Sequence, residues 1–493
     1  MKRRGGRWSG PVVSALLHAG LAFVVLKTLV FRRPEPEPAV AVRLVSVPKV
    51  GSADRSGRRS PKTKRTAEAP LPSDALQRTP APEPMPDWAS VRSPVAVATL
   101  PETLPSVLAG RTEAGRKKAL ARYGGRYGGQ AEKAVRKGLA WLASVQCKDG
   151  SWGVGASRSM TARQERMRLT GLGLLAFLAH GETPASPEYG ATVSRAVAFL
   201  LKEQEKETGL FCPLSKTIGS HDDIGVYGHA ISVYALAEAY GLTRLPLLAE
   251  PVRRGVERIL AGQQACGGWD HRYQHAKWHD LSVTGWQIQA LRAAQVAGIE
   301  PERTKAALTR AVPFVEGLHA GEGRFYYRTG NRKPNAGLDY MTGVAVLSLQ
   351  LSGADSAPAA RAGLRFLEDV RCSDWRAGWE KTRRNKSFNV AYEWYYVTQA
   401  LFWRGGSRWT RWNERFAPTL VRAQDASGAW KPPSETGVRI SKDAIYVTEF
   451  CVLSLETYYR LLPGAGRGGG GKPAPERFEF ANDVRVVVWR RNE

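Results

Sequence analysis

A short sequence pattern recurs at a nearly constant interval along the second half of the chain. In each copy a threonine or tyrosine precedes a glycine or glutamate, and successive copies are 57, 57, 58, 50 and 56 residues apart. The copies are Thr170-Gly171, Tyr227-Gly228, Thr284-Gly285, Thr342-Gly343, Tyr392-Glu393 and Thr448-Glu449. Intervals of this length indicate one supersecondary unit that is copied and stacked. The units form either an open solenoid or a closed ring.

Each unit is predicted to be a pair of helices. Residues 131–146 place apolar side chains at helical spacing, with lysine and arginine outside that stripe, which is typical of a helix wet on one side. Residues 169–179 are apolar almost all round, which predicts a helix buried on every face. A glycine followed closely by an aromatic residue recurs between the helices of each pair, as in Gly267-Gly268-Trp269.

The ends of the repeat region favour closure. An open solenoid needs polar capping repeats, whereas the first and last units here are as apolar as the middle ones. We therefore predict an all-α fold, an (α/α)6 toroid of six helical hairpins over residues 126–463. The inner helices would form a barrel inside a ring of outer helices.

The turns between helices carry a family resemblance. Gln146, Gly150 and Trp152 have the form of the "QW" motif, and its core recurs in two further segments, Gln263…Gly267…Trp269 and Gln424…Gly428…Trp430. The chain resembles the α/α-toroid superfamily of squalene and hopene cyclases and protein prenyltransferase β subunits, and residues 392–412 resemble uncharacterised bacterial toroid proteins. We expect the glutamine amide to bond free backbone groups at an outer-helix end, with the indole covering it.

The catalytic motifs of these families are incomplete here. The prenyltransferase zinc ligands D-x-C and D-x-x-H match Asp280-Leu281-Ser282 and Asp443-Ala444-Ile445-Tyr446, where serine and tyrosine replace the zinc-binding residues. The D-x-D-D acid of the cyclases is missing, and Asp222-Asp223 is the nearest approach to it. We expect no metal and no cofactor.

In several repeats an aspartate precedes the recurring Thr/Tyr-Gly/Glu pair by three to five residues. Asp223, Asp280 and Asp443 are predicted helix N-caps, for which aspartate is a preferred residue. If they also face a central cavity, they are the candidate catalytic acids. Side chains expected to line that cavity are His229, Trp286, Tyr340, Glu393, Trp394 and Tyr446. His271, His275 and His279 share helical spacing, but they follow a Gly-Gly turn, so locally bonded loop histidines are preferred to a metal site.

The N-terminal region predicts a membrane anchor. Residues 1–10 are basic, and the apolar residues 11–31 are long enough to cross a bilayer, with a cleaved signal peptide as the alternative. Ser14 and His18, with the Pro-Glu run at 34–38, resemble the anchor of TonB-type energy transducers, which implies motor proteins of the inner membrane as partners. We expect a single-pass protein of the bacterial inner membrane with its toroid in the periplasm.

The flanking segments and the charge complete this organisation. Residues 32–125 are rich in proline and basic residues and predict a disordered linker, and residues 464–493 form a C-terminal tail. The net charge is +27, but no nucleic-acid-binding module is visible, so a membrane surface is the preferred partner. The five cysteines lie far apart and imply no disulfide framework.

Three functions remain open at this point. The first is a membrane-tethered module that binds a ligand, such as an apolar or isoprenoid small molecule, or acts as a scaffold. The second is an enzyme that acts on an isoprenoid or polycyclic lipid, with a cavity-rim aspartate as the acid. The third is carbohydrate cleavage. A deep apolar tunnel with one buried acid would favour the enzyme, and a centre filled with side chains would favour the module.

Overall fold

The computed structural model describes residues 108–153, 160–214, 224–273, 279–330, 339–384, 389–433 and 444–461. These residues belong to the second of two compact units of the chain, Pro80–Glu493. The anchor predicted at 11–31, the tail at 464–493 and most of the linker lie outside them. None of the helices within the described ranges is long and apolar enough to cross a membrane.

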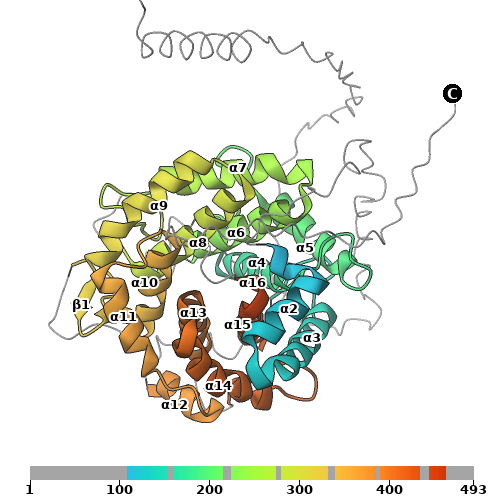
Figure 1. The fold of residues 1–493 in the computed structure, drawn as a ribbon. Coiled ribbons are helices and arrows are strands. Elements are labelled where there is room, and N and C mark those ends of the chain that lie inside the picture. The colour runs from blue at the N-terminus through green and yellow to red at the C-terminus, as the bar shows by residue number, and fades with distance from the viewer. Residues whose placement is uncertain are drawn as a thin grey trace, which may run out of the picture. The chain divides into compact units, whose positions relative to one another are not determined.

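The described helices form two concentric layers (Figure 1). The inner helices are α4 (Met160–His180), α6 (Gly225–Thr243), α8 (Leu281–Ala297), α10 (Asp339–Leu351), α13 (Val390–Arg404) and α15 (Ala444–Leu455). The outer helices are α3 (Gly128–Ser144), α5 (Gly190–Glu203), α7 (Pro246–Ala261), α9 (Pro301–Glu316), α11 (Pro358–Glu368) and α14 (Gly406–Ala423). Proline occupies the first position of α7, α9 and α11, where its missing N–H costs no hydrogen bond.

Contacts between the helices close the ring. Each inner helix packs against the next in chain order, and the last of them, α15, packs against both α4 and α3. The last outer helix, α14, also contacts the first one, α3, so the outer layer is closed as well. The described part of the chain is therefore a closed α/α toroid (Figure 1).

In four of the repeats, a glutamine before the turn links the repeat to the next one. Gln146 Nε2 donates 3.0 Å hydrogen bonds to a carbonyl in its own turn and to the Thr192 carbonyl in α5. Gln204 and Gln263 bond in the same way. Gln424 bonds its own turn and the Ala134 carbonyl in α3, at 2.8 Å each. The glutamine bond that joins neighbouring repeats therefore also joins the sixth repeat to the first.

The recurring threonine anchors the turn to the inner helix. The Trp152 backbone N–H donates to Thr170 Oγ1 at 3.1 Å, and its indole N–H donates to the Leu142 carbonyl at 2.8 Å. The same two bonds occur at Trp269 and Trp430. The neighbouring glycine serves packing, since a Cβ added at Gly171 would lie 2.7 Å from Ile231 Cγ2 of α6.

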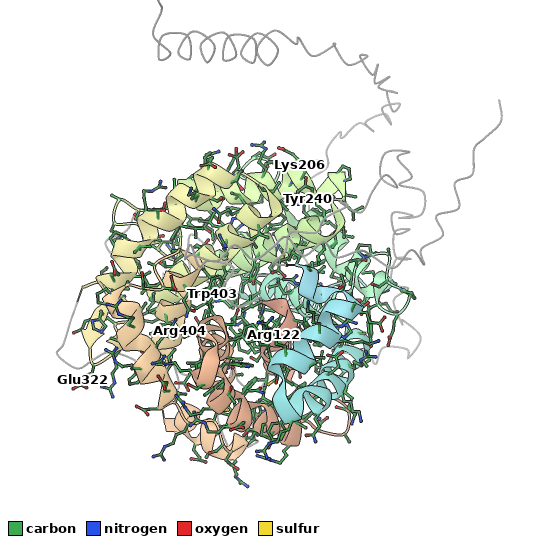
Figure 2. The ribbon with its side chains drawn as sticks, viewed as in Figure 1. Arg122, Lys206, Tyr240, Glu322, Trp403 and Arg404 are labelled. Atoms are coloured by element: carbon green, nitrogen blue, oxygen red, sulfur yellow. The ribbon has the colours of Figure 1, made fainter. Side chains whose placement is uncertain are left out.

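Three short elements depart from the plain repeat. Helix α12 (Trp375–Arg384) is inserted in the fifth repeat, so Gly378 and Trp379 lie within a helix instead of a turn. Strands β1 (His319–Gly321) and β2 (Arg324–Phe325) pair antiparallel in the fourth repeat, which the all-α prediction did not include. Figure 2 shows Glu322, between these strands, at the outer rim.

The predicted linker ends earlier than residue 125. Residues 109–123 form the 3-10 helix η1 (Ala109–Arg111) and helix α2 (Glu113–Tyr123), and η2 (Gly125–Tyr127) leads into α3. Both η1 and α2 pack against α16 (Thr457–Arg460), which also contacts the inner helices α4, α13 and α15. Sequence analysis missed α2 because only Gly115 and Ala119 of this basic helix are buried, so it lacks an apolar stripe.

Candidate functional site at the mouth of the inner barrel

Polar side chains from three repeats meet where the inner helices begin. We call this group the mouth cluster, and it consists of Tyr227, His271, Asp280, Ser282 and Tyr327. Tyr227 lies in the first turn of α6, and Ser282 lies in the first turn of α8. His271 and Tyr327 lie in loops that follow α7 and β2.

Asp280 is the centre of the mouth cluster and the N-cap of α8. Its Oδ1 accepts the Val283 backbone N–H at 2.7 Å and the Ser282 hydroxyl at 2.9 Å, which satisfies a free donor of the helix start. Its Oδ2 accepts the Tyr327 hydroxyl at 3.2 Å and lies against His271 Nε2. The side chain is only 5% exposed, so these internal donors replace water around the carboxylate.

Tyr227 extends the hydrogen-bond network across the mouth. Its hydroxyl lies 2.6 Å from Ser282 Oγ, and its ring meets the His271 ring edge-on at 5.4 Å. Burial raises the pKa of Tyr227 well above its usual value, and the charge on Asp280 adds to the rise. The tyrosine therefore stays protonated and remains a hydrogen-bond donor at neutral pH.

Backbone hydrogen bonds hold the Tyr327 loop against the start of α8. The Leu281 N–H donates to the Tyr327 carbonyl at 2.8 Å, and the Thr329 N–H donates to the His279 carbonyl at 3.1 Å. The two segments therefore run antiparallel, with an isolated bridge between Asp280 and Arg328. This pairing brings a side chain from the fourth repeat onto a carboxylate of the third.

Aromatic side chains occupy the barrel below the mouth cluster. Trp286 of α8 packs against Phe450 of α15 at 6.4 Å between ring centroids, although these helices are not neighbours in the ring. Phe450 also lies 4.9 Å from Tyr395 and 4.7 Å from Tyr446. Side chains from opposite sides of the barrel thus meet at its centre. We call this group, completed by Tyr392 and Tyr396, the aromatic column.

Four of the predicted site residues lie at or near this column. Trp286 and Tyr446 are buried members of it. Tyr340 is half-buried in the first turn of α10, and burial raises its pKa to about 12. Asp280 lies above the column as the N-cap described above. Asp223 and Asp443, the other predicted acids, lie outside the described residues.

The remaining predicted residues lie between the two helical layers. Trp394 packs on Trp375 of the outer helix α12, at 5.9 Å between ring centroids. Glu393 is 2% exposed and lies close enough to Cys372 for its charge to add to the effect of burial in raising the thiol pKa. His229 is fully buried, accepting the Phe211 N–H at 3.1 Å and facing the Gly255 carbonyl at 3.2 Å.

His229 takes the place that threonine has in other repeats. It holds the Phe211 backbone N–H as Thr170 holds that of Trp152. The repeat interval pointed instead to Tyr227 as this counterpart, and the structure shifts the register by two residues. Both ring nitrogens of His229 face protein groups, so its geometry is that of a structural residue.

Sequence analysis did not identify the whole mouth cluster. It treated Tyr227 as a repeat marker and His271 as a loop histidine, and it passed over Tyr327. Among the described residues, no group of three metal-binding side chains occurs. His271 pairs with Asp280, His279 lies 3.3 Å from Thr329 Oγ1, and His275 is not described.

Comparisons with known proteins concern the fold. No family model and no curated protein matches the chain. The chain is similar to the type II terpene cyclase MstE from Scytonema at 12% identity and a TM-score of 0.44, over 68% of this chain and 99% of that one. It is also similar to the GH76A alpha-1,6-mannanase from Salegentibacter sp. HEL1_6 at 10% identity and a TM-score of 0.47, over 66% and 98%.

Proposed function

We propose that the toroid is a ligand-binding module of the terpenoid cyclase and prenyltransferase type of fold, without the chemistry of those enzymes. The observation that carries this proposal is the bonding of Asp280. Its carboxylate accepts from a backbone N–H and two hydroxyls, and it lies against the His271 imidazole. These donors occupy both carboxylate oxygens, and the bond to the Val283 N–H makes the side chain the N-cap of α8, so Asp280 serves the fold at this position.

The aromatic column supports the same proposal. A cyclase must fold a long apolar substrate inside the barrel, and this requires an open cavity beside the acid. Here Trp286, Phe450 and Tyr395 pack together at the barrel centre. A ligand is therefore expected to bind at the mouth, above the column.

The mouth cluster has the side chains needed to bind a ring that carries several hydroxyl groups, such as a sugar unit. Tyr227 and Tyr327 offer hydroxyls, and the buried Asp280 carboxylate, through Ser282 and Tyr327, holds them in place. The rings of Tyr227, Tyr327, Tyr340 and Tyr392 are half-buried, so each keeps some exposed surface near the helix starts. Aromatic faces with convergent polar groups are the usual composition of a small-molecule site.

Removing one hydroxyl from the mouth cluster tests this proposal. We expect a pyranoside such as methyl glucoside, methyl galactoside or N-acetylglucosamine to give saturation-transfer NMR signals with the full-length chain in detergent. Tyr327→Phe should weaken binding about five-fold, the effect of one lost hydrogen bond. Tyr240→Phe, in the last turn of α6 at the opposite end of the helix, is the matched control and should bind as the wild type does. Transfer that is absent for every sugar, or unchanged in Tyr327→Phe, would refute the assignment.

The alternative is an enzyme that acts on an isoprenoid or polycyclic lipid. The pairing of His271 with Asp280 favours it, because a carboxylate-bound imidazole is a common proton carrier. We expect no product when the chain is incubated with squalene or farnesyl diphosphate. A product that disappears in Asp280→Asn, Asp223→Asn or Asp443→Asn would establish the enzyme instead.

We further propose that residues 11–31 tether the toroid to the bacterial inner membrane, with the toroid in the periplasm. The apolar run and the preceding basic residues support this. Ser14 and His18 would then share one face of the anchor, available to a motor protein of the same membrane.

Fractionation of expressing cells tests the tether. The full-length chain is expected in the membrane pellet after alkaline carbonate washing, and protease added to spheroplasts should degrade the toroid. Deletion of residues 2–33 should move the protein to the soluble fraction. A wild-type chain that is shortened and soluble would show a cleaved signal peptide instead.

A further inference from the structure

A cavity lies at the opposite end of the inner helices from the mouth cluster. It is bounded by the C-terminal parts of α6, α8, α10 and α13 and by residues of η1 and α16, and its volume is about 630 Å³, counting the part open to solvent. Apolar side chains make up much of its wall, namely Leu108, Val296, Leu351, Trp403 and Leu461. Figure 2 shows Trp403 at the inner side of the ring.

Arg460 is the buried cation of this cavity. Its side chain is fully buried, and its Nη2 donates to the Tyr234 hydroxyl at 2.6 Å and to the Tyr395 hydroxyl at 3.3 Å. Within the described part of the chain, its Nε and Nη1 have no hydrogen-bond partner. Arginine remains charged in proteins, and an unsatisfied buried donor is costly. These nitrogens therefore mark a place for an acceptor.

The other charges on the wall do not neutralise Arg460. Arg111 forms two 2.8 Å hydrogen bonds with Glu238, so the opposite charges of these two side chains neutralise each other. Arg292 adds a second cation, and among the described residues its Nη1 donates to the neutral Gln295 at 2.6 Å and to no carboxylate. Glu456 lies one helical turn from Arg460 but does not line the cavity, and burial raises its pKa well above the usual value, which favours the neutral form. The cavity is therefore positive and otherwise largely apolar.

We propose that this cavity binds an amphiphile with a single anionic headgroup and one apolar chain. The headgroup, a carboxylate or a phosphate monoester, accepts from Nε and Nη1 of Arg460. The chain lies along Leu108, Val296 and Trp403 towards the opening. A charge-assisted hydrogen bond in a desolvated site is stronger than a neutral one, so the cavity selects an anion over the matching alcohol.

Photo-crosslinking of the full-length chain in nanodiscs tests this site. The probe is a long-chain carboxylate with a diazirine in its chain, and the labelled peptides are identified by mass spectrometry. We expect adducts in residues 292–297, 399–403 and 457–461. Oleate should compete at a concentration at least ten-fold lower than oleyl alcohol, and comparison with dodecyl phosphate shows which headgroup is preferred. Adducts confined to other segments, or equal competition by the alcohol, would overturn the proposal.

Two variants separate binding from folding. Arg460→Met replaces a buried charge with an apolar chain of similar length, an exchange that folded proteins tolerate. It should abolish the preference for oleate over oleyl alcohol while the circular dichroism spectrum stays unchanged. Val296→Trp fills the apolar part of the cavity without touching Arg460 and should reduce crosslinking at least five-fold. Unchanged labelling and selectivity in both folded variants would refute the site.

Discussion

Gly267→Ala is expected to lower the free energy of unfolding by about 3 kcal/mol, because the substitution adds a backbone penalty to a steric one. Gly267 has a φ of +92°, in the left-handed region, where a side chain costs about 1 to 2 kcal/mol. The added Cβ would also lie 2.0 Å from the Arg310 carbonyl oxygen of α9. Relief of this clash requires α9 to move away from the turn. The shift of the denaturant midpoint at constant slope measures the effect.

Gly298→Ala is the matched control for this prediction. Gly298 also has a left-handed φ, +81°, but no heavy atom lies within 4 Å of the Cβ position. Alanine there should cost only the backbone penalty, about 1 kcal/mol. If both variants lose the same stability, the close approach between the turn and the next outer helix contributes nothing, and our account of how repeats join is wrong at this contact.

Acidification from pH 7.5 to pH 5 is expected to cost about 2 kcal/mol of stability through His229 alone. Burial lowers the pKa of His229 from its ordinary 6.5 to about 3, with a smaller contribution from the nearby Arg258 charge. Below pH 6.5 the imidazole of His229 binds a proton in the unfolded chain but stays neutral in the folded chain. Stability is therefore complete above pH 6.5 and falls as the pH drops towards 3.

A neutral replacement isolates this effect from other titrating groups. His229→Gln keeps an acceptor for the Phe211 N–H and a donor for the Gly255 carbonyl, but it does not titrate. The stability difference between wild type and variant, measured by urea unfolding, should shrink by about 2 kcal/mol between pH 7.5 and pH 5. A difference independent of pH would mean that His229 is hydrated or protonated in the folded protein.

Features whose cause is local could be predicted from the sequence. The Gln-Gly-Trp segments are visible because the glutamine bonds its own turn, four residues away, and the indole bonds the preceding outer helix, ten residues away. The paired helices follow from their apolar patterns, and the closed ring follows from apolar end repeats. Asp280 was predicted as an N-cap for the same reason, since a cap contacts the helix that it starts.

The register of the second repeat could not be predicted. Histidine and threonine both offer an acceptor for the turn N–H, so His229 replaces threonine without resembling it in sequence. Helix α2 was missed because two small buried residues, Gly115 and Ala119, fix it against its neighbours. Both cases depend on contacts made in the folded protein, and these cannot be deduced from the spacing of apolar residues in the sequence.

The amino-acid sequence by itself determined the helical pairs, their number and the chemistry of the turns that join them. Only the tertiary structure decided which side chains share a site. Tyr227, Asp280 and Tyr327 belong to different repeats, and Arg460 meets Tyr234 across more than 200 residues of chain. Closing the ring brings together equivalent ends of helices that are distant in sequence. No local pattern encodes that proximity, because it arises from the geometry of the ring as a whole.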